Sequence, residues 1–578
     1  MRNILVAFIL FSFPYFSQVS FPYDRFSQWQ HSGLLQSFDT NYEVIHLEDY
    51  NVDPNGILDC SSILQGLLNQ YDHAIFEFPE GTFRLNQPIE LHSHQVIVGK
   101  GPDLTHFLAD LNGLGHVFSI NGGLGQLTFE IDSAIQKNQA FIVCPQHNLN
   151  IGEWIYLQND DTSLVYSTWA IGTTGQVLKI QQINGDSIWL DEPIRRDYSG
   201  ACWLRKITPA REIGFRCFSV ERQDDTAPSQ TSTFRFYATV DAFIESIYSR
   251  NCTFAHVDIS CSSRITVRKN FFTEGFSYGG GGRAYGVVLQ QSAGTCLIED
   301  NIFKHLRHSI LLQSGANGNV CTLNYSLDPF WQESLLTNNS AGEIVLHGNY
   351  PYSNLFEQNC VGNIVIDNSH GANGPDNLFY RNRANLYGIF FSDQSSPNQL
   401  FIGNHVTNLT FPYNLVNWTI SGSGHYLFAN NNKGTIVPAE TQLISDTSFA
   451  YIEKPEFVNT DVWLHIGDQP AINYPIPAEN RWLNQAIFST SCGQTDLSLV
   501  EDSIVIEYFP NPVENNLKVW CSTAYFGPVK LVDAYGRYFN IEQMVGQDLN
   551  IHVENLPCGV YFLEFSFLNR AIKFIKSC

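Results

Sequence analysis

The stretch EIVLHGNYPYSNLFEQN, residues 343–359, carries the pattern that decides the fold. It consists of a short apolar run, a turn, and a second apolar run that ends in asparagine. Its first nine residues align without gaps with GVVLQQSAG from Gly286, SILLQSGAN from Ser309, NIVIDNSHG from Asn363 and GIFFSDQSS from Gly388. The middle of the chain is therefore built from an internal repeat.

The spacing of this repeat indicates a solenoid. Successive segments start 23, 34, 20 and 25 residues apart, and the longest interval contains the extra loop SLDPFWQESLLTNNS. A unit of that length with two or three short strands cannot bury its apolar face alone, so neighbouring units stack and share one core. We expect the strands of adjacent coils to pair in parallel.

Asparagine recurs at the end of the second apolar run of each unit. Because asparagine tolerates left-handed turn geometry and its amides can stack, we predict an asparagine ladder along one corner of the coils. The residues are Asn251, Asn270, Asn301, Asn324, Asn359, Asn382, Asn404 and Asn430.

Composition favours β-structure and restricts the partners. The 578 residues include 42 Gly, 42 Phe and 26 Tyr but only 2 Met, a balance typical of strands and turns. The formal net charge of −24 argues against nucleic acid or an anionic membrane as the main partner. A polyanionic substrate would need a local basic patch or bridging cations, and Ca²⁺ stays an open choice without a recognisable ligand set.

Residues 1–20, MRNILVAFILFSFPYFSQVS, have one Arg followed by an apolar core too short to span a bilayer, as in a cleaved secretory signal. No later run reaches the ~18 apolar residues of a membrane-spanning helix, so we predict no transmembrane segment. Export permits disulfides among the 13 cysteines. Most of them stand in strand-like runs, however, and we expect these to be small buried side chains.

The repeat resembles that of the pectate-lyase-like right-handed parallel β-helix proteins. Residues 49–70, DYNVDPNGILDCSSILQGLLNQ, are similar to the entry segment of the rhamnogalacturonase and epimerase-like branch, where an acidic turn leads into a short capping helix. The resemblance implies an all-β, right-handed parallel β-helix over residues 41–450, with a helix covering the open amino-terminal end of its core.

Two regions interrupt or follow the solenoid. Residues 130–206 have the pattern of hairpins with Asn-Gly and Gly-Asp turns, and we predict a β-rich insertion beside the early coils. Such an insertion either walls a substrate groove or is purely structural. Residues 451–500 are expected to form the end of the solenoid and a linker.

Residues 501–578 contain short alternating strands and predict a small β-sandwich. They resemble the C-terminal sorting domain of the type IX secretion system of Bacteroidota, which implies export across the outer membrane and the secretion machinery as a partner. The matching residues are Pro510, Asn511, Pro512, Asp533, Gly536, Leu556, Gly559, Val560, Tyr561, Lys573 and Lys576.

Alternation along the aligned segments separates inward from outward side chains. The second and fourth columns, which contain Ile344 and Leu346, are uniformly apolar and are predicted to face the core. The first and fifth columns are polar, and we expect both to face outward. His308 has the inward parity of Ile310 and is predicted to be a buried structural histidine.

Four ionisable residues on consecutive coils make the candidate catalytic site: Arg307, Glu343, His347 and Asp367. His347 and Asp367 share the fifth column one coil apart, where a carboxylate can orient an imidazole. Arg307 can neutralise a substrate carboxylate, and this set suits β-elimination from a uronate. Glu343 and Asp367 as paired carboxylates would instead suit hydrolysis. Polar ladders that merely keep a solenoid soluble are the structural alternative.

Loops beside these coils supply candidate substrate-binding residues. The segments 277–286, 328–339 and 368–377 contribute aromatic and charged side chains that can stack on sugars or hydrogen-bond to them. The candidates are Gln313, Arg283, Tyr285, Trp331, Tyr352 and His370.

The sequence thus predicts a secreted or surface-attached enzyme that degrades an extracellular polysaccharide by lyase or hydrolase chemistry. The alternative is a non-catalytic glycan-binding or adhesive solenoid. Known catalytic patterns do not transfer: LHGN at 346–349 resembles an Arg-His-Gly-Asn element of alginate and dermatan lyases, but Leu346 occupies the arginine position.

Overall fold

The computed structural model describes residues 21–577 apart from short gaps, so the predicted signal peptide, residues 1–20, lies outside the described residues. The gaps are residues 36–37, 39–40, 132, 226–230, 334–340, 393–395, 412–419, 440, 442–447, 452–453, 459–465, 468–474, 489–491, 493–505, 510–512, 534–536 and 566–569.

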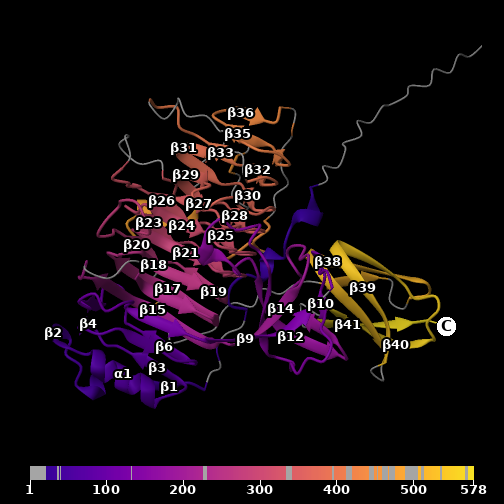
Figure 1. Ribbon diagram of the computed structural model, residues 1–578, viewed down its shortest axis with the longest axis horizontal. Helices are drawn as coiled ribbons and strands as arrows, with labels where there is room; N and C mark the ends of the chain where they lie inside the picture. The colour runs from indigo at the N-terminus through magenta and orange to yellow at the C-terminus, as the bar shows by residue number, and fades with distance from the viewer. Residues whose placement is uncertain are drawn as a thin grey trace, which may run out of the picture.

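Parallel strands stacked in three ladders form the largest sheet of the described residues (Figure 1). Along the chain, a coil in the middle of the stack crosses ladder A, then ladder B, then ladder C. One coil, for example, consists of β22 (Leu297–Glu299), β23 (Ile302–Lys304) and β24 (His308–Leu312), and β25 (Val320–Thr322) starts the next. The predicted parallel β-helix is confirmed.

The ladders share four long strands. β15 (Ala210–Arg222) and β17 (Thr239–Arg250) belong to ladders A and B, while β29 (Cys360–Ile366) and β31 (Arg383–Phe391) belong to ladders B and C. The other strands of ladder A are β1 (Glu43–His46), β3 (Ala74–Glu77), β6 (Gln95–Val98), β19 (Ser263–Arg268), β22, β25, β28 (Leu355–Glu357), β30 (Leu378–Tyr380), β32 (Leu400–Ile402) and β34 (Tyr426–Phe428). Those of ladder B are β2 (Asn55–Asp59), β4 (Gly81–Leu85), β7 (Thr105–Ala109), β20 (Phe271–Thr273), β23, β26 (Tyr325–Leu327), β33 (His405–Val406) and β35 (Asn430–Asn432), which also pairs antiparallel with β36 (Thr435–Val437). Those of ladder C are β5 (Ile89–Leu91), β8 (Phe118–Asn121), β16 (Ser232–Tyr237), β18 (Ala255–Ser260), β21 (Tyr285–Gln290), β24 and β27 (Ile344–Leu346).

The register of ladder C confirms the gapless alignment of the repeat. Ile344 pairs with Ile310 on the preceding coil and with Ile364 on the following one, and Val287 and Ile389 extend the row. All five side chains lie in one hydrophobic core and are at most 1% exposed. Burying such a side chain contributes roughly 1.5–3 kcal/mol, so the inward columns hold the coils together.

The asparagine ladder is confirmed from Asn270 to Asn430. Each amide Nδ2 donates to Oδ1 of the asparagine on the next coil at 2.9–3.0 Å. Asn251 does not belong to it, because this residue has a φ of 57° in a turn, while the Ile247 amide donates to the first ladder amide, Asn270 Oδ1. Within the ladder the left-handed residue is the one before the asparagine, as at Gln358 with a φ of 53°.

The amino-terminal end of the core is covered by α1 (Ser61–Gln70), as the resemblance implied. Leu64, Leu67 and Leu68 recur on one face of this helix and pack into the hydrophobic core of the coils. Asp59 Oδ1 accepts a hydrogen bond from the Ser61 amide at 3.0 Å, which satisfies one free N–H group at the start of the helix. The helix therefore closes an end that would otherwise expose apolar side chains.

The insertion is an antiparallel six-stranded sheet beside the stack of coils (Figure 1). Tyr156 OH lies 2.7 Å from Ser292 Oγ, and Thr173 Oγ1 lies 2.9 Å from Ser314 Oγ. The insertion also packs against Ala238 and Val240 at the start of β17, so it extends from the early coils to the middle of the stack. In sheet order its strands are β10 (Phe141–Val143), β13 (Ser187–Leu190), β12 (Gln176–Asn184), β11 (Trp154–Asn159), β14 (Cys202–Thr208) and β9 (Gly123–Ile131).

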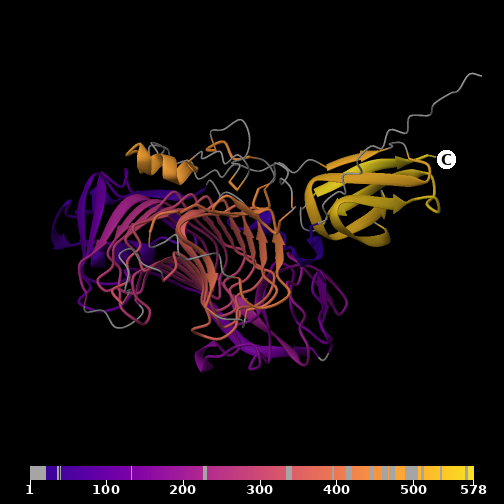
Figure 2. The same ribbon diagram turned by 90° about the horizontal axis from the view of Figure 1, so that it is seen from above.

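The carboxy-terminal part begins as a segment on the outside of the coils. Helix α2 (Pro477–Leu483) lies there (Figure 2), held by an ion pair between Arg481 and Asp300. A disulfide joins Cys492 to Cys217 on β15. Five antiparallel strands then form a separate sheet: β37 (Ile506–Phe509), β38 (Asn516–Asp533), β39 (Tyr538–His552), β40 (Gly559–Phe565) and β41 (Arg570–Lys576). Of the predicted sorting-domain residues, Pro510, Asn511, Pro512 and Gly536 lie outside the described residues.

The cysteines behave mainly as buried hydrophobic side chains, as predicted. The free and buried ones are Cys60, Cys144, Cys202, Cys252, Cys261, Cys296, Cys321 and Cys360. Within the described residues, no helix has the length and apolarity to cross a membrane.

Candidate functional site

The first column of the repeat faces inward, which corrects the predicted position of Glu343. This side chain is fully buried at the corner between ladders B and C, where Oε1 accepts from Ser326 Oγ at 2.7 Å and Oε2 accepts from the Asn363 amide at 2.8 Å. Ser326 belongs to β26, in register with the core residue Phe303. The chain bends at this column, so strict alternation does not extend into it. Glu343 therefore lies inside the coil and apart from the candidate site.

Burial raises the pKa of Glu343 to about 7, although hydrogen bonds from Ser326 and the Asn363 amide act in the opposite direction. The neighbouring coils show the same inward corner. Ser309 Oγ lies 2.7 Å from Ser326 Oγ, and a Cβ on Gly286 would come within 2.6 Å of the Phe303 ring. Small or hydrogen-bonded side chains are thus required in this column for packing.

The fifth column faces outward, as predicted, and it joins His347 to Asp367. The Nδ1 atom of His347 lies 2.6 Å from Asp367 Oδ2, and the two side chains are 11% and 14% exposed. Burial opposes ionisation of Asp367, but the hydrogen bond and charge of His347, with the amide of Ser369, lower its pKa to about 2. A charged carboxylate therefore fixes the ring and the Nδ1–H tautomer of His347. We call this pair the dyad.

His308 is buried, as predicted, at 2% exposed, but it lies on the outer face of the coil and not in the core that its parity in the sequence indicated. Its ring centroid lies 4.9 Å from that of Tyr285 and 6.0 Å from that of His347. Because Ser309 turns inward at the corner, both His308 and Leu311 point outward, three residues apart. The sequence does carry a signal for this bend, because Gly, Ser and Asn recur in the first column and are typical of turns at corners.

The imidazole of His308 is neutral, and one of its two ring nitrogens has a hydrogen-bond partner. Nδ1 donates to the Gly342 carbonyl at 2.7 Å, while Nε2 is buried and has no partner among the described residues. Burial lowers the pKa of His308 to about 3, and neighbouring Arg307 and His347 act in the same direction. His308 Nε2 is therefore an unused hydrogen-bond acceptor beside the dyad.

Arg307 ties the glycine-rich loop to the coils. Its Nη1 donates to the Gly279 carbonyl at 2.8 Å and to the Gly281 carbonyl. Its guanidinium carbon lies 5.7 Å from the Tyr285 ring and 5.8 Å from the Trp331 ring. Arg307 Nε and Trp331 Nε1 are buried donors without partners among the described residues. Two unused donors and the unused acceptor of His308 thus occur on the same outer face.

The candidate substrate-binding residues are only partly brought together. His370 lies 4.9 Å from the His347 ring, and its pKa is lowered by burial and by His347. Gln313 is mostly buried and donates to Gln290 at 2.7 Å, whereas Arg283 is exposed and donates to Ser277 at 3.0 Å. Tyr285 is 3% exposed and donates to the Gly281 carbonyl at 3.2 Å.

Tyr352 was predicted to bind substrate, but the structure places it away from any exposed surface. It is fully buried under the insertion, where its hydroxyl donates to the Gly175 carbonyl at 3.1 Å, so its predicted stacking on a sugar is wrong. The insertion covers this turn, and nothing in the sequence of the turn itself signals that cover.

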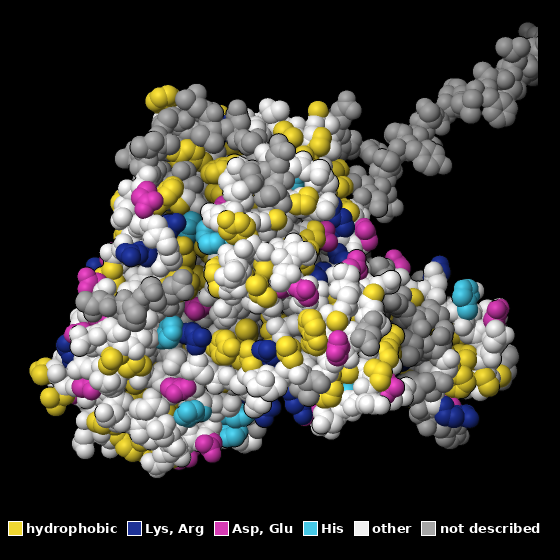
Figure 3. All heavy atoms as spheres, viewed as in Figure 1, with side chains coloured by type: hydrophobic (Ala, Val, Ile, Leu, Met, Phe, Trp, Pro, Cys, Tyr) yellow, Lys and Arg dark blue, Asp and Glu magenta, His cyan; other side chains and the backbone are white. Residues whose placement is uncertain are grey.

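Two residues of the insertion, which the sequence did not single out, lie beside the site. Ser167 Oγ lies 3.3 Å from His370 Nδ1, and the Trp169 ring lies 5.6 Å from the His370 ring. Among the described residues, Arg307, His308 and His370 lie around the dyad, whose own Asp367 supplies the carboxylate. Figure 3 shows acidic and basic side chains interspersed on the face in view, although the chain has a net charge of −24.

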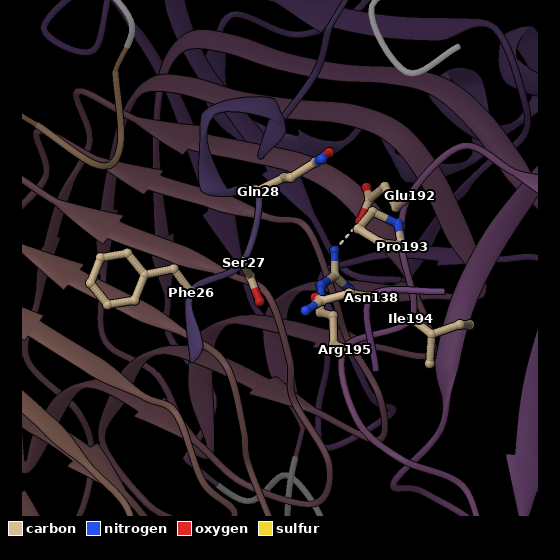
Figure 4. Close-up of a pocket in the computed structure, with 8 residues that line it drawn as sticks. All are labelled: Phe26, Ser27, Gln28, Asn138, Glu192, Pro193, Ile194 and Arg195. Carbon is tan, nitrogen blue, oxygen red and sulfur yellow. Dashed lines mark hydrogen bonds and ion pairs between the residues drawn. The ribbon is translucent and has the colours of Figure 1, made fainter. Parts of the chain in front are cut away.

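Two other hollows do not include the dyad. The cavity of Figure 4, between the amino-terminal segment and the insertion, holds about 10 Å³, room for one water at most. Arg195 in its wall pairs with Glu192 and donates to Asn317. A cleft of about 300 Å³ lies beside α2 and is lined by Arg383, Thr407, Pro475, Glu479 and Leu483. Within the described residues, no group of three or more His, Cys, Asp or Glu is arranged to hold a metal ion.

The fold and the tail together define a parallel β-helix protein that is exported. Residues 507–576 match the family model of the secretion system C-terminal sorting domain, which confirms the predicted sorting domain and export across the outer membrane to the surface or the medium. No curated protein matches this chain.

Solved structures with a similar fold include phage tailspikes. The tailspike protein gp49 of Pseudomonas phage LKA1 is 13% identical with a TM-score of 0.51, over 63% of this chain and 64% of its own. The tailspike gp61 of Pseudomonas phage phi297 is 11% identical with a TM-score of 0.47, over 89% and 96%. The A-module of the Azotobacter vinelandii mannuronan C-5 epimerase AlgE4 is 10% identical with a TM-score of 0.35, over 66% and 97%. This chain thus spans less than two thirds of the gp49 chain, and the likeness is one of fold.

Proposed function

We propose that this exported β-helix protein cleaves an extracellular polysaccharide that contains uronate sugars, with His347 as the general base. The observation that carries the proposal is the 2.6 Å contact between His347 Nδ1 and Asp367 Oδ2. Because Asp367 accepts from Nδ1, the lone pair of His347 lies on Nε2, which makes no hydrogen bond to any described residue. A base held in this way can take a proton from a carbon acid.

The surroundings of the dyad favour an anionic sugar. Arg307 supplies a permanent positive charge, and its guanidinium lies 5.8 Å from the Trp331 ring. Arg307 thus offers a positive charge to a polyanion in a protein whose net charge of −24 would otherwise repel it.

The position of Glu343 favours elimination over hydrolysis. Hydrolysis in its usual form needs two carboxyl groups on either side of the scissile bond, and Glu343 lies inside the coil. In the elimination, His347 Nε2 takes the proton from the carbon beside the uronate carboxylate, and Arg307 balances the charge of the enolate-like intermediate. The C–O bond at the adjacent carbon then breaks, and solvent protonates the departing oxygen.

The test is incubation of the full chain with uronate polymers (polygalacturonate, alginate, hyaluronate) and with neutral laminarin and dextran. We expect ultraviolet absorbance from unsaturated products on at least one uronate polymer and none on the neutral ones. Reducing ends without this absorbance would make the protein a hydrolase. Binding without any cleavage would make it a non-catalytic glycan-binding solenoid.

A further inference from the structure

Two aromatic side chains on a loop of the insertion are open to solvent. Tyr166 is 76% exposed and Trp169, in the short 3-10 helix η4 (Thr168–Ala170), is 46% exposed. Among the large aromatic side chains of the described insertion, these two are the exposed ones, whereas Tyr156 and Tyr198 are buried. The loop around Tyr166 and Trp169 thus holds two rings that contribute little to the core.

The backbone that carries these rings is fixed. Asp161, 1% exposed, closes the loop by accepting from the Gly172 amide at 2.7 Å and from the Thr174 amide at 2.9 Å. The amides of Tyr166 and Ser167 both donate to Asn349 Oδ1 of the coils at 2.9 Å. Rings held on a pre-ordered backbone lose little conformational entropy when a ligand packs on them.

The loop also requires a glycine on the coil below it. Gly371 has a φ of 76°, and a Cβ at this position would lie 2.5 Å from Tyr166 Cβ. The close approach places the loop directly on the turn that carries His370, one residue away. The position of the two rings is therefore set by the coils of the site itself.

A continuous row of rings connects this loop to the dyad. The Trp169 ring lies 5.6 Å from the His370 ring, and the His370 ring lies 4.9 Å from the His347 ring. Ser167 Oγ, between the two exposed aromatic residues in the chain, lies 3.3 Å from His370 Nδ1. A polymer whose reacting sugar lies at His347 would continue over His370 onto the loop.

We propose that Tyr166 and Trp169 form a binding subsite for a second sugar ring of the same glycan chain, beyond the reacting one. This inference rests on the proposed function of the dyad. Aromatic rings offer a large apolar face with a polar edge, which suits the apolar face of a pyranose flanked by hydroxyls. The subsite carries no charge of its own, so it recognises the sugar ring rather than its carboxylate.

The subsite predicts that long chains are bound better than short ones. The test uses the full chain with the double substitution Tyr166→Ala and Trp169→Ala, and with Ile57→Ala as control. Ile57 is 75% exposed in β2, near the amino-terminal end of the stack and remote from the insertion loop. The substrate is the uronate polymer that wild type degrades best, and then the shortest fragment of it that wild type still cleaves.

We expect the double variant to raise KM and the dissociation constant for the polymer about 10-fold, with kcat on the shortest fragment and the melting temperature unchanged. The Ile57→Ala control should match wild type on all counts. If the double variant binds and degrades the polymer as wild type does, the subsite is refuted while the proposed function stands. If wild type neither binds nor degrades any of the polymers, the proposed function fails and the subsite with it.

Discussion

Replacing Asn359 by alanine tests what the asparagine ladder contributes to stability. The Asn359 side chain is fully buried and makes four hydrogen bonds. Its Oδ1 accepts from Asn324 Nδ2 at 2.9 Å and from the Asn324 amide at 3.1 Å. Its Nδ2 donates to Asn382 Oδ1 at 2.9 Å and to the Cys321 carbonyl at 2.8 Å.

The stability lost in Asn359→Ala depends on which former partners of Asn359 keep another hydrogen bond. Asn382 Oδ1 still accepts from the Asn359 amide, and Asn324 Nδ2 still donates to the Ile298 carbonyl. The Asn324 amide and the second hydrogen of its Nδ2 are left as buried donors, each costing about 1–3 kcal/mol. With the two lost acceptor contacts we expect Asn359→Ala to lower the free energy of unfolding by about 4 kcal/mol.

The assay is urea unfolding followed by tryptophan fluorescence, with Asn385→Ala as the matched control. Asn385 stands three residues after Asn382 in β31 but is exposed, so its replacement should change the free energy of unfolding by less than about 0.5 kcal/mol. Equal unfolding midpoints for the two variants would refute the reasoning that the ladder stabilises the coils.

Three further predictions concern the buried acid, the dyad and the disulfide. Because the pKa of Glu343 is raised to about 7, its contribution is full below its unfolded value near 4.5 and is lost as the pH rises through 7. Between pH 4 and 8 the unfolding free energy of the Glu343→Gln variant should therefore decline by about 3 kcal/mol less than that of wild type. Urea unfolding at both pH values measures this difference. An unchanged pH dependence would contradict the buried position of Glu343. Asp367→Asn should lower the rate of glycan cleavage about 100-fold or more, because the carboxylate no longer fixes the His347 tautomer, and unchanged initial rates would contradict the role of the dyad. Cys217→Ser should destabilise the chain by about 3 kcal/mol, seen as a lower melting temperature that reduction of wild type reproduces; a wild type insensitive to reductant would contradict it.

The fold could be predicted from the sequence because aligned positions of successive repeats pair with each other on adjacent coils. The rows of Ile344 and Leu346 and the asparagine ladder follow from local patterns that recur in each unit, while the capping helix followed from the resemblance of residues 49–70. The exposed pairing of His347 with Asp367 followed from the same alignment, since residues in one column lie on adjacent coils.

The positions of the other site residues could not be predicted from the aligned columns of the repeat. The bend at the first column reverses the parity, so Glu343 lies inside the coil, and His308, although buried as predicted, lies on its outer face. Tyr352 was misplaced because a sheet of the insertion, remote in sequence, covers it. Trp169 was missed for the same reason, since only the docking of the insertion brings it to His370. Local periodicity predicts a strand, but contacts between remote segments decide what its outer face meets.

The central claim is that His347 acts on a glycan, and its most direct test compares the His347→Ala and His92→Ala variants. His92 is exposed and contacts Asn69 beside the capping helix, far along the stack from the dyad. The measurement is the initial rate of product formation on the uronate polymer that wild type cleaves. We predict that His347→Ala loses about 100-fold or more of the rate while His92→Ala keeps it. Equal rates for both variants would contradict the claim.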